Sequence, residues 1–155
     1  MTDLDAVDRH VLALLAEDGR RSYTDIARET GLSTSAAHQR VRRLEQRGAV
    51  VGYSATLDPQ VTGLPLTAFV SVTPIDPGAP DDAPERLRHL AAVEACHSVA
   101  GDESYILKVR VAGPSELEHL LQEIRGAAQV RTRTTVVLST PWEGRTPPLP
   151  DPRRA

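Results

Sequence analysis

The chain has 155 residues, of which 40% are hydrophobic, and a formal net charge of −3 at pH 7. This length suits one ordinary domain or two small ones, and the hydrophobic content excludes wholesale disorder. The single cysteine, Cys96, excludes an internal disulfide and a cysteine-based zinc site, and it fits a reducing cytoplasm. We expect no membrane association, because no apolar run is long enough to span a bilayer and the N-terminal residues lack a signal-peptide layout.

Two helices are predicted at the start of the chain. Apolar residues recur at helical spacing over residues 5–17, with acids in the opening turn, and Gly19 ends this helix. Ser22 then opens a short second helix, because Asp25 follows it at the spacing of a capping box. Gly31 ends that helix in a tight turn.

A third helix, over residues 33–47, organises the rest of the chain. Ala37, Val41 and Leu44 fall on one stripe, which predicts a face turned toward a core. The opposite side holds hydroxyl, amide and guanidinium groups and no carboxylate. Such groups read base edges or hold phosphates, although a solvated amphipathic helix has the same pattern. These outer residues are Ser35, Gln39, Arg42, Arg43 and Gln46, with His38 at their edge.

A helix, a glycine-containing turn and a longer basic helix form the helix-turn-helix layout, whose second helix enters the major groove. Seven arginines face three acids between residues 19 and 53, a local charge of +4 in an acidic chain. Arg20 and Arg21 lie in the loop before the second helix, where they either contact phosphate or are simply solvated. Residues 49–58 alternate enough to predict a strand or small wing. We therefore assign residues 1–53 to a winged helix-turn-helix DNA-binding domain and residues 54–63 to a hinge.

The periodicity changes beyond this hinge, and residues 64–140 are predicted to form a second domain. Ser115 and Glu118 have a capping-box spacing at the start of its second helix. A proline-rich tail over residues 141–155 is expected to be extended. The order strand, helix, strand, strand, helix, strand indicates a ferredoxin-like domain, so the whole chain is an α+β protein. The predicted elements are 66–72, 85–92, 93–99, 105–111, 115–124 and 130–139.

Catalytic and metal-binding patterns are weak. Cys96 and His97 are neighbours on a predicted strand, so their side chains point to opposite faces and do not form a dyad. Cys96 is expected to be a small core residue. The five histidines show no metal-ligand spacing, and we predict no catalytic residue, metal or cofactor.

The loop over residues 101–105 is the candidate ligand site of the second domain. Gly101 can take a positive φ, which would bring backbone amides close to a ligand carboxylate. Asp102 or Glu103 could pair with an ammonium group, and Ser104 and Tyr105 supply hydroxyls. These groups are complementary to a zwitterionic amino acid, although an ordinary hairpin turn has the same composition.

Three stretches carry a resemblance to a known family. They are LDAVDRHVLALLAEDGR, GLSTSAAHQRVRRLEQRGAVVGYSATLD and GDESYILKVRV, and the similarity covers about residues 3–140. The chain resembles the Lrp/AsnC, or feast/famine, transcriptional regulators of bacteria and archaea. One departure is Ser104, where the family often has aspartate.

The resemblance implies a winged helix-turn-helix, a hinge strand and a C-terminal βαββαβ domain called RAM, which is ACT-like. It implies a cytoplasmic regulator that forms homodimers and octamers, binds imperfect palindromes in double-stranded DNA, and responds to an amino acid or related effector. Carried over by position, the loop Gly101–Tyr105 is the effector candidate. The DNA-reading candidates are Ser33, Thr34, Ser35, His38, Gln39, Arg40 and Arg43.

Two other functions stay open at this point. An architectural DNA-binding protein without an effector would have the same first domain, and it would differ from a regulator mainly in sequence selectivity. Siroheme decarboxylases share the two-domain build but need histidines and cations around a tetrapyrrole cleft. The best cluster of cations in this sequence lies instead on the predicted DNA face.

Overall fold

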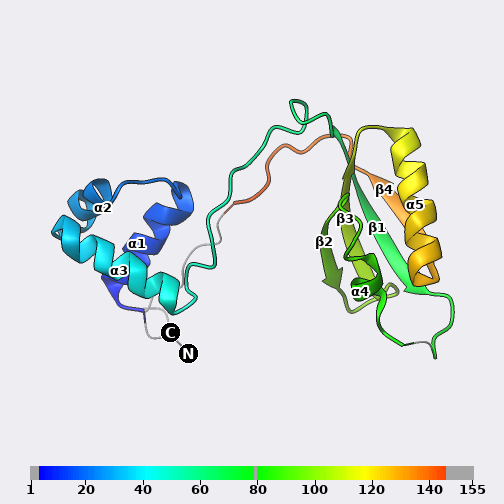
Figure 1. Cartoon of the computed structure of the whole chain (residues 1–155), viewed down its shortest axis with the longest axis horizontal. Helices are drawn as coiled ribbons and strands as arrows, with labels where there is room; N and C mark the ends of the chain where they lie inside the picture. The colour runs from blue at the N-terminus through cyan, green and yellow to red at the C-terminus, as the bar shows by residue number, and fades with distance from the viewer. Residues whose placement is uncertain (1–3, 79, 146–155) are drawn as a thin grey trace. The chain divides into compact units, whose positions relative to one another are not determined.

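The structure is a computed structural model that describes residues 4–78 and 80–145. The chain divides into two compact units (Figure 1). The first holds residues 4–56 together with the described tail residues 142–145, and the second holds Leu57–Pro141. The change of unit falls within the predicted hinge, while the described tail residues group with the first unit.

Three helices build the first unit: α1 (Ala6–Glu17), α2 (Tyr23–Thr30) and α3 (Thr34–Gln46). Each begins where a side chain caps a free backbone amide, since Asp5, Ser22 and Ser33 all accept a hydrogen bond from the residue three positions later. Gly31 ends α2 with a φ of 70°, a left-handed conformation that favours glycine. The predicted helices are confirmed.

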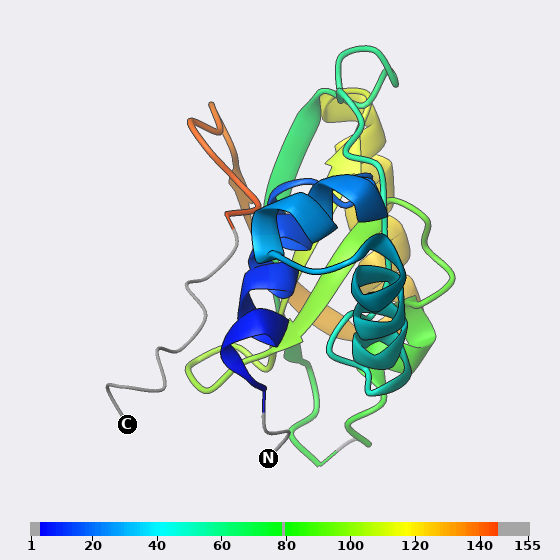
Figure 2. The same ribbon diagram turned by 90° about the vertical axis from the view of Figure 1, so that its left-hand side faces the viewer.

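The three helices pack together (Figure 1, Figure 2). Their buried apolar side chains form one small core. The predicted inward stripe of α3 is confirmed, because Ala37, Val41 and Leu44 are almost fully buried. They pack against side chains from α1 and α2, which fixes the orientation of α3 and leaves its opposite side exposed. The partners are Val11, Leu14, Leu15, Ile26 and Ala27.

The strand or wing predicted over residues 49–58 is wrong. Residues 51–58 have no regular secondary structure, and the side chain of Val51 is 97% exposed. A strand needs a hydrogen-bonded neighbour, and every strand of the described residues belongs to the sheet of the second unit. Alternating side chains alone therefore do not make a strand here.

The second unit contains one four-stranded antiparallel sheet with the order β2-β3-β1-β4. Two helices connect its strands in the predicted βαββαβ order, so the ferredoxin-like prediction is confirmed (Figure 1). The elements are β1 (Leu66–Pro74), α4 (Ala83–Leu87), β2 (Val93–Ser98), β3 (Tyr105–Val111), α5 (Pro114–Ala128) and β4 (Val130–Val136).

Both helix starts in this unit differ from the prediction. α4 is short and begins at Ala83 rather than Glu85, and Leu87 and Leu90 are buried. α5 begins at Pro114, which suits the first helical turn because it lacks an amide donor, so Ser115 lies inside the helix and does not cap it. The capping box predicted from Ser115 is wrong.

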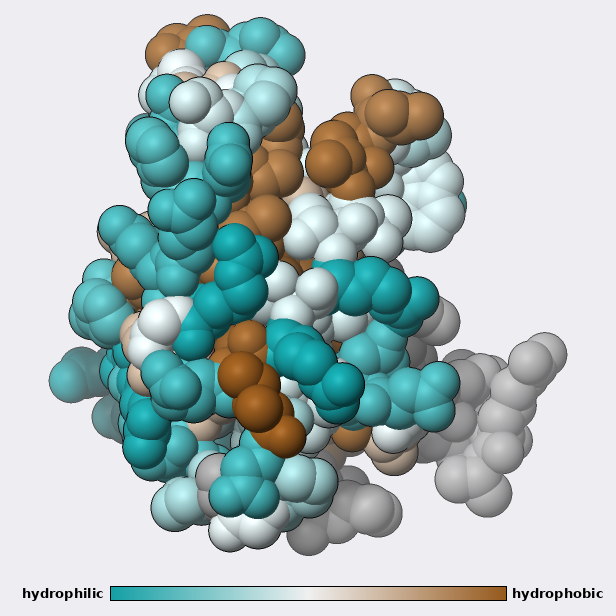
Figure 3. Space-filling view, turned by 90° about the vertical axis from the view of Figure 1, so that its right-hand side faces the viewer, coloured by the Kyte–Doolittle hydropathy of each residue, from teal (hydrophilic) through white to brown (hydrophobic). Residues whose placement is uncertain are grey.

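The two faces of the sheet have different roles. Alternate residues of β1 and β3 pack beneath both helices, where Val70 and Leu107 are 0% exposed. The opposite face carries no helix, and Phe69 on it is 41% exposed. Figure 3 shows mainly hydrophilic side chains on the side of the chain where α5 lies. No helix of the described residues is long and apolar enough to cross a membrane.

Candidate nucleic-acid interface and effector site

The outer side of α3 is exposed as predicted. Its N-terminal turn presents Ser33, Thr34 and Ser35, although the Ser33 hydroxyl is already used, accepting from the Ala36 amide at 3.2 Å. The next turns expose amide, imidazole and guanidinium groups suited to base edges and phosphates. The exposed residues of these turns are His38, Gln39, Arg42 and Arg43.

Arg40 lies differently from the other predicted DNA-reading residues. Its side chain is 21% exposed and turned toward α1, where its Nη1 donates to Asp5 at 2.5 Å and to Asp8 at 2.7 Å. Arg43 is 51% exposed, and its Nη2 lies 3.5 Å from the same Asp8 carboxylate. The two arginines that the resemblance grouped together therefore have different surroundings.

The two loop arginines also differ. Arg20 is exposed, and its side chain has no ion-pair partner among the described residues. Arg21 is 22% exposed, and its Nη2 pairs with Glu17 at 2.9 Å. Arg20 is thus the freer of the two to meet a phosphate.

Two tyrosines that were not predicted from the sequence, Tyr23 and Tyr53, contact side chains of α3. Tyr23 of α2 packs edge-on against His38, with ring centroids 4.7 Å apart and an interplanar angle of 71°. The Tyr53 hydroxyl donates to Glu45 at 2.9 Å, and burial together with this hydrogen bond raises the pKa of Tyr53 to about 12. Glu45 is exposed in the last turn of α3, so only the earlier turns are free of carboxylates. These contacts join residues from different elements, so no local sequence pattern predicts them.

The side chains of the candidate effector loop lie on both faces of the sheet. Asp102 and Glu103 line a polar pocket of about 270 Å³ on the helix-free face, beside Arg131 and Arg133 of β4. Glu103 pairs with Arg133, and this hydrogen bond holds the pKa of Glu103 below its usual value. Both signs of charge therefore meet in one pocket; Ser71, Thr73 and Thr132 complete its lining.

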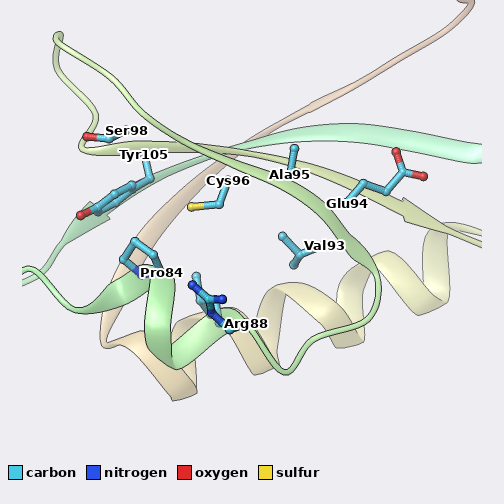
Figure 4. A pocket seen from close by; sticks show the side chains of 9 residues that line it. Pro84, Arg88, Val93, Glu94, Ala95, Cys96, Ser98 and Tyr105 are labelled. Carbon is cyan, nitrogen blue, oxygen red and sulfur yellow. The ribbon is translucent and has the colours of Figure 1, made fainter. Parts of the chain in front are cut away.

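Tyr105 lies on the opposite side of the sheet, facing α4 (Figure 4). It is 6% exposed, and its hydroxyl donates to Asp81 at 2.5 Å, a bond that raises the pKa of Tyr105 to about 12. The tyrosine borders a separate pocket of about 510 Å³, together with Arg88 and Cys96. The five predicted effector residues therefore do not form one site in a single chain.

The backbone of this loop also differs from expectation. Gly101 is not among the glycines with positive φ, and a Cβ added there would meet only Glu103, at 3.8 Å. The idea that a left-handed Gly101 presents amides to a ligand is wrong. The Ser104 amide is also engaged, since it donates to the Val72 carbonyl at 3.0 Å.

Cys96 is exposed, so its assignment to the core is wrong. It lies opposite Leu107 on the helix-facing side of the sheet, but β2 is an edge strand that the short α4 leaves partly uncovered (Figure 4). Partial burial still raises the pKa of its thiol. No group of three or more metal-binding side chains occurs in residues 4–78 and 80–145.

Comparisons with known proteins match both units. The model of the AsnC-type helix-turn-helix domain matches residues 4–45, and that of the Lrp/AsnC ligand binding domain matches residues 67–147. The HTH-type transcriptional regulator LrpA of Mycobacterium tuberculosis is 54% identical over 142 residues, which cover 92% of this chain and 95% of that protein. The leucine-responsive regulatory protein of Escherichia coli K12 is 39% identical, over 88% of this chain and 85% of its own length.

A solved structure gives the same result for the fold. The feast or famine regulatory protein of M. tuberculosis, complexed with L-methionine, superposes with a TM-score of 0.92 at 52% identity. The match covers 95% of this chain and 100% of that one.

Proposed function

The chain belongs to the Lrp/AsnC family of transcriptional regulators, and we propose that α3 reads double-stranded DNA while an amino acid bound by the second unit modulates that binding. The observation that carries the DNA half of the proposal is the exposed polar side of α3, whose first three turns hold no carboxylate. Such a helix is suited to the major groove. The relatives are regulators rather than enzymes, and we place this chain with the DNA in the cytoplasm.

The base-reading role is assigned to the exposed side chains of α3. Gln39, Arg42 and Arg43 are long enough to reach base edges, and Ser33, Thr34 and Ser35 lie at the helix N-terminus, which attracts phosphate. Arg20 would contact the backbone beside the groove. Arg21 and Arg40, which pair within the chain, would reach DNA only if those ion pairs opened.

The test is to select duplexes from a random pool with the full chain and then measure the affinity of variants for the selected site. Arg42→Ala should weaken binding by about 1–3 kcal/mol if Arg42 contacts a base. Arg88→Ala, which removes another exposed arginine, from the second unit, is the matched control. If both variants kept full affinity, the assignment of α3 would be wrong. If no consensus emerged from the pool, the chain would be an architectural DNA-binding protein.

The effector half of the proposal rests on the polar pocket beside the 101–105 loop. An amino acid carries one carboxylate and one ammonium group, and this pocket offers Arg131 for the first and Asp102 for the second. The structure of a protein 52% identical to this chain was solved in complex with L-methionine, which makes that amino acid the first to test. Glu103 and Arg133 would hold the pocket walls together through their ion pair.

Calorimetric titration with L-methionine and L-leucine tests this assignment. Arg131→Gln should weaken the binding of whichever ligand the unaltered chain binds by about tenfold or more, because a charge-assisted hydrogen bond is lost. Arg88→Gln, at the edge of the separate pocket next to α4, should leave that affinity unchanged. The opposite pattern would move the effector to the pocket beside α4.

Self-association completes the proposal. The helix-free face of the sheet exposes Phe69 beside Lys108, its β3 neighbour, and a second copy would cover this face in a homodimer that can assemble further to an octamer. A two-fold dimer presents two copies of α3, so its sites should be imperfect palindromes. Phe69→Arg should convert the dimer to a monomer in light scattering at micromolar concentration; an unchanged mass would place the interface elsewhere.

A further inference from the structure

The first unit contains a buried carboxylate, that of Asp8. Asp8 is 2% exposed, one of two buried polar or charged residues among those that the structure describes. Its Oδ2 accepts from the Asp5 amide at 3.3 Å, and its own amide donates to Asp5 Oδ1 at 2.7 Å, which closes a capping box at the start of α1. That leaves Oδ1 of Asp8 for groups outside α1.

The groups that it meets are both arginines of α3. Arg40 Nη1 lies 2.7 Å from Oδ1, and Arg43 Nη2 lies 3.5 Å from the same atom. Two carboxylates, of Asp5 and Asp8, thus face two guanidinium groups, and the cluster is neutral. A buried carboxylate is tolerated because it is paired in this way.

The two arginines do not share the cluster equally. Arg40 donates from one nitrogen, Nη1, to both carboxylates and is 21% exposed, so this arginine is turned into the protein. Arg43 approaches Asp8 with one nitrogen, Nη2, at 3.5 Å, and its side chain is 51% exposed, so its guanidinium is held by one contact and is partly open to solvent. A fork fixed at one end can present its other donors in a set direction with little loss of side-chain entropy.

We propose that Asp8 is a positioning residue for sequence recognition: it orients Arg43 toward a base edge, while Arg40 supplies the counter-charge for the buried carboxylate. Arg40 in this arrangement does not read DNA itself. The inference rests on the proposed function, because it assumes that Arg43 meets DNA. It adds that base selectivity is set partly from α1, a helix that does not enter the groove.

The experiment is a double-mutant cycle on the full chain, read out as discrimination between the duplex selected from a random pool and its single-base variants. A ratio of affinities is the useful quantity, because removing a negative charge strengthens binding to every duplex alike and cancels in the ratio. Arg43→Ala should lower discrimination at one base pair by about five- to 150-fold. Asp8→Asn should lower it at the same base pair by about threefold or more, and should have little further effect in the Arg43→Ala background.

Asp25→Asn is the matched control, since Asp25 also lies in the first turn of a helix in this unit and pairs with an arginine, Arg28, at 2.6 Å. It should change discrimination by less than about twofold. Should Asp8→Asn no longer unfold cooperatively, Asp8→Glu replaces it in the cycle, because it keeps the charge but displaces the carboxylate.

The outcomes separate this inference from the function on which it rests. If Arg43→Ala kept full discrimination, the base-reading role of Arg43 in the proposed function would fail. Two other results would overturn only the positioning role of Asp8. In the first, Arg43→Ala loses discrimination but the Asp8 variants keep it. In the second, the Asp8 substitution lowers discrimination as much in the Arg43→Ala background as in the unaltered chain.

Discussion

Replacing Tyr105 by phenylalanine isolates one hydrogen bond that ties the start of β3 to the loop before α4. The ring is 6% exposed and would stay in place, so the change removes only the hydroxyl that donates to Asp81 at 2.5 Å. A hydrogen bond to a charged group typically contributes about 1.5–3 kcal/mol. Because Asp81 itself is exposed, we expect Tyr105→Phe to lower the free energy of unfolding at pH 7 by about 1–2 kcal/mol, nearer the low end of that range.

The size of this effect should depend on pH. The hydrogen bond raises the pKa of Tyr105 to about 12, whereas an unfolded tyrosine titrates near about 10. A raised pKa means that the folded state favours the protonated hydroxyl. Its contribution is therefore fully present below about pH 10 and is lost as the pH rises through about 12. The difference between the two proteins should shrink over that interval, while the similar titration of Tyr53 affects both equally.

Urea unfolding at a series of pH values, with hydrogen exchange of β3 to report on the second unit, measures this difference. Tyr23→Phe is the control, since no hydrogen bond from its hydroxyl occurs among the described residues and its ring contact with His38 would remain. That control should change stability by less than about 0.5 kcal/mol. If Tyr105→Phe cost as much in an Asp81→Asn background as in the unaltered chain, the hydrogen bond would not be the cause.

Three further predictions address the core, the DNA contact and the exposed thiol. Leu107→Ala, at a fully buried position in the middle of the sheet, should lower the free energy of unfolding of the second unit by about 2–5 kcal/mol in the same urea experiment. Arg20→Ala should weaken binding to all duplexes alike and reduce the slope of log affinity against log salt by about 1; a change at one base pair only would contradict a phosphate contact. Cys96 should react with a thiol reagent without denaturant, at a rate that rises with pH because the thiolate is the nucleophile. Partial burial raises the pKa of this thiol, so the rise should come at higher pH than for a free cysteine; a reaction that required urea would show that the thiol is covered.

Local chemistry in the sequence determined the positions of most elements. Ser22 and Ser33 cap helices because a hydroxyl can satisfy a free amide three residues later, and Gly31 ends one because it accepts a left-handed backbone. The 3.6-residue period placed Ala37, Val41 and Leu44 on the inward face of α3, where they are buried. These signals act over one or two turns, so they can be read without a fold.

Only the tertiary structure decided which side chains meet across the chain. Arg40 faces Asp5 and Asp8 because α1 and α3 share a core, although more than 30 residues separate them in sequence. Cys96 is exposed because the strand order places β2 at an edge, and strand order is not a local property. Glu103 and Tyr105 are two residues apart, a spacing that would put them on one face of a regular strand, but Glu103 lies in the loop before β3. Glu103 therefore pairs with Arg133 on one face, while Tyr105 donates to Asp81 on the other. Each of these outcomes depends on residues brought together by packing, which no stretch of the sequence contains by itself.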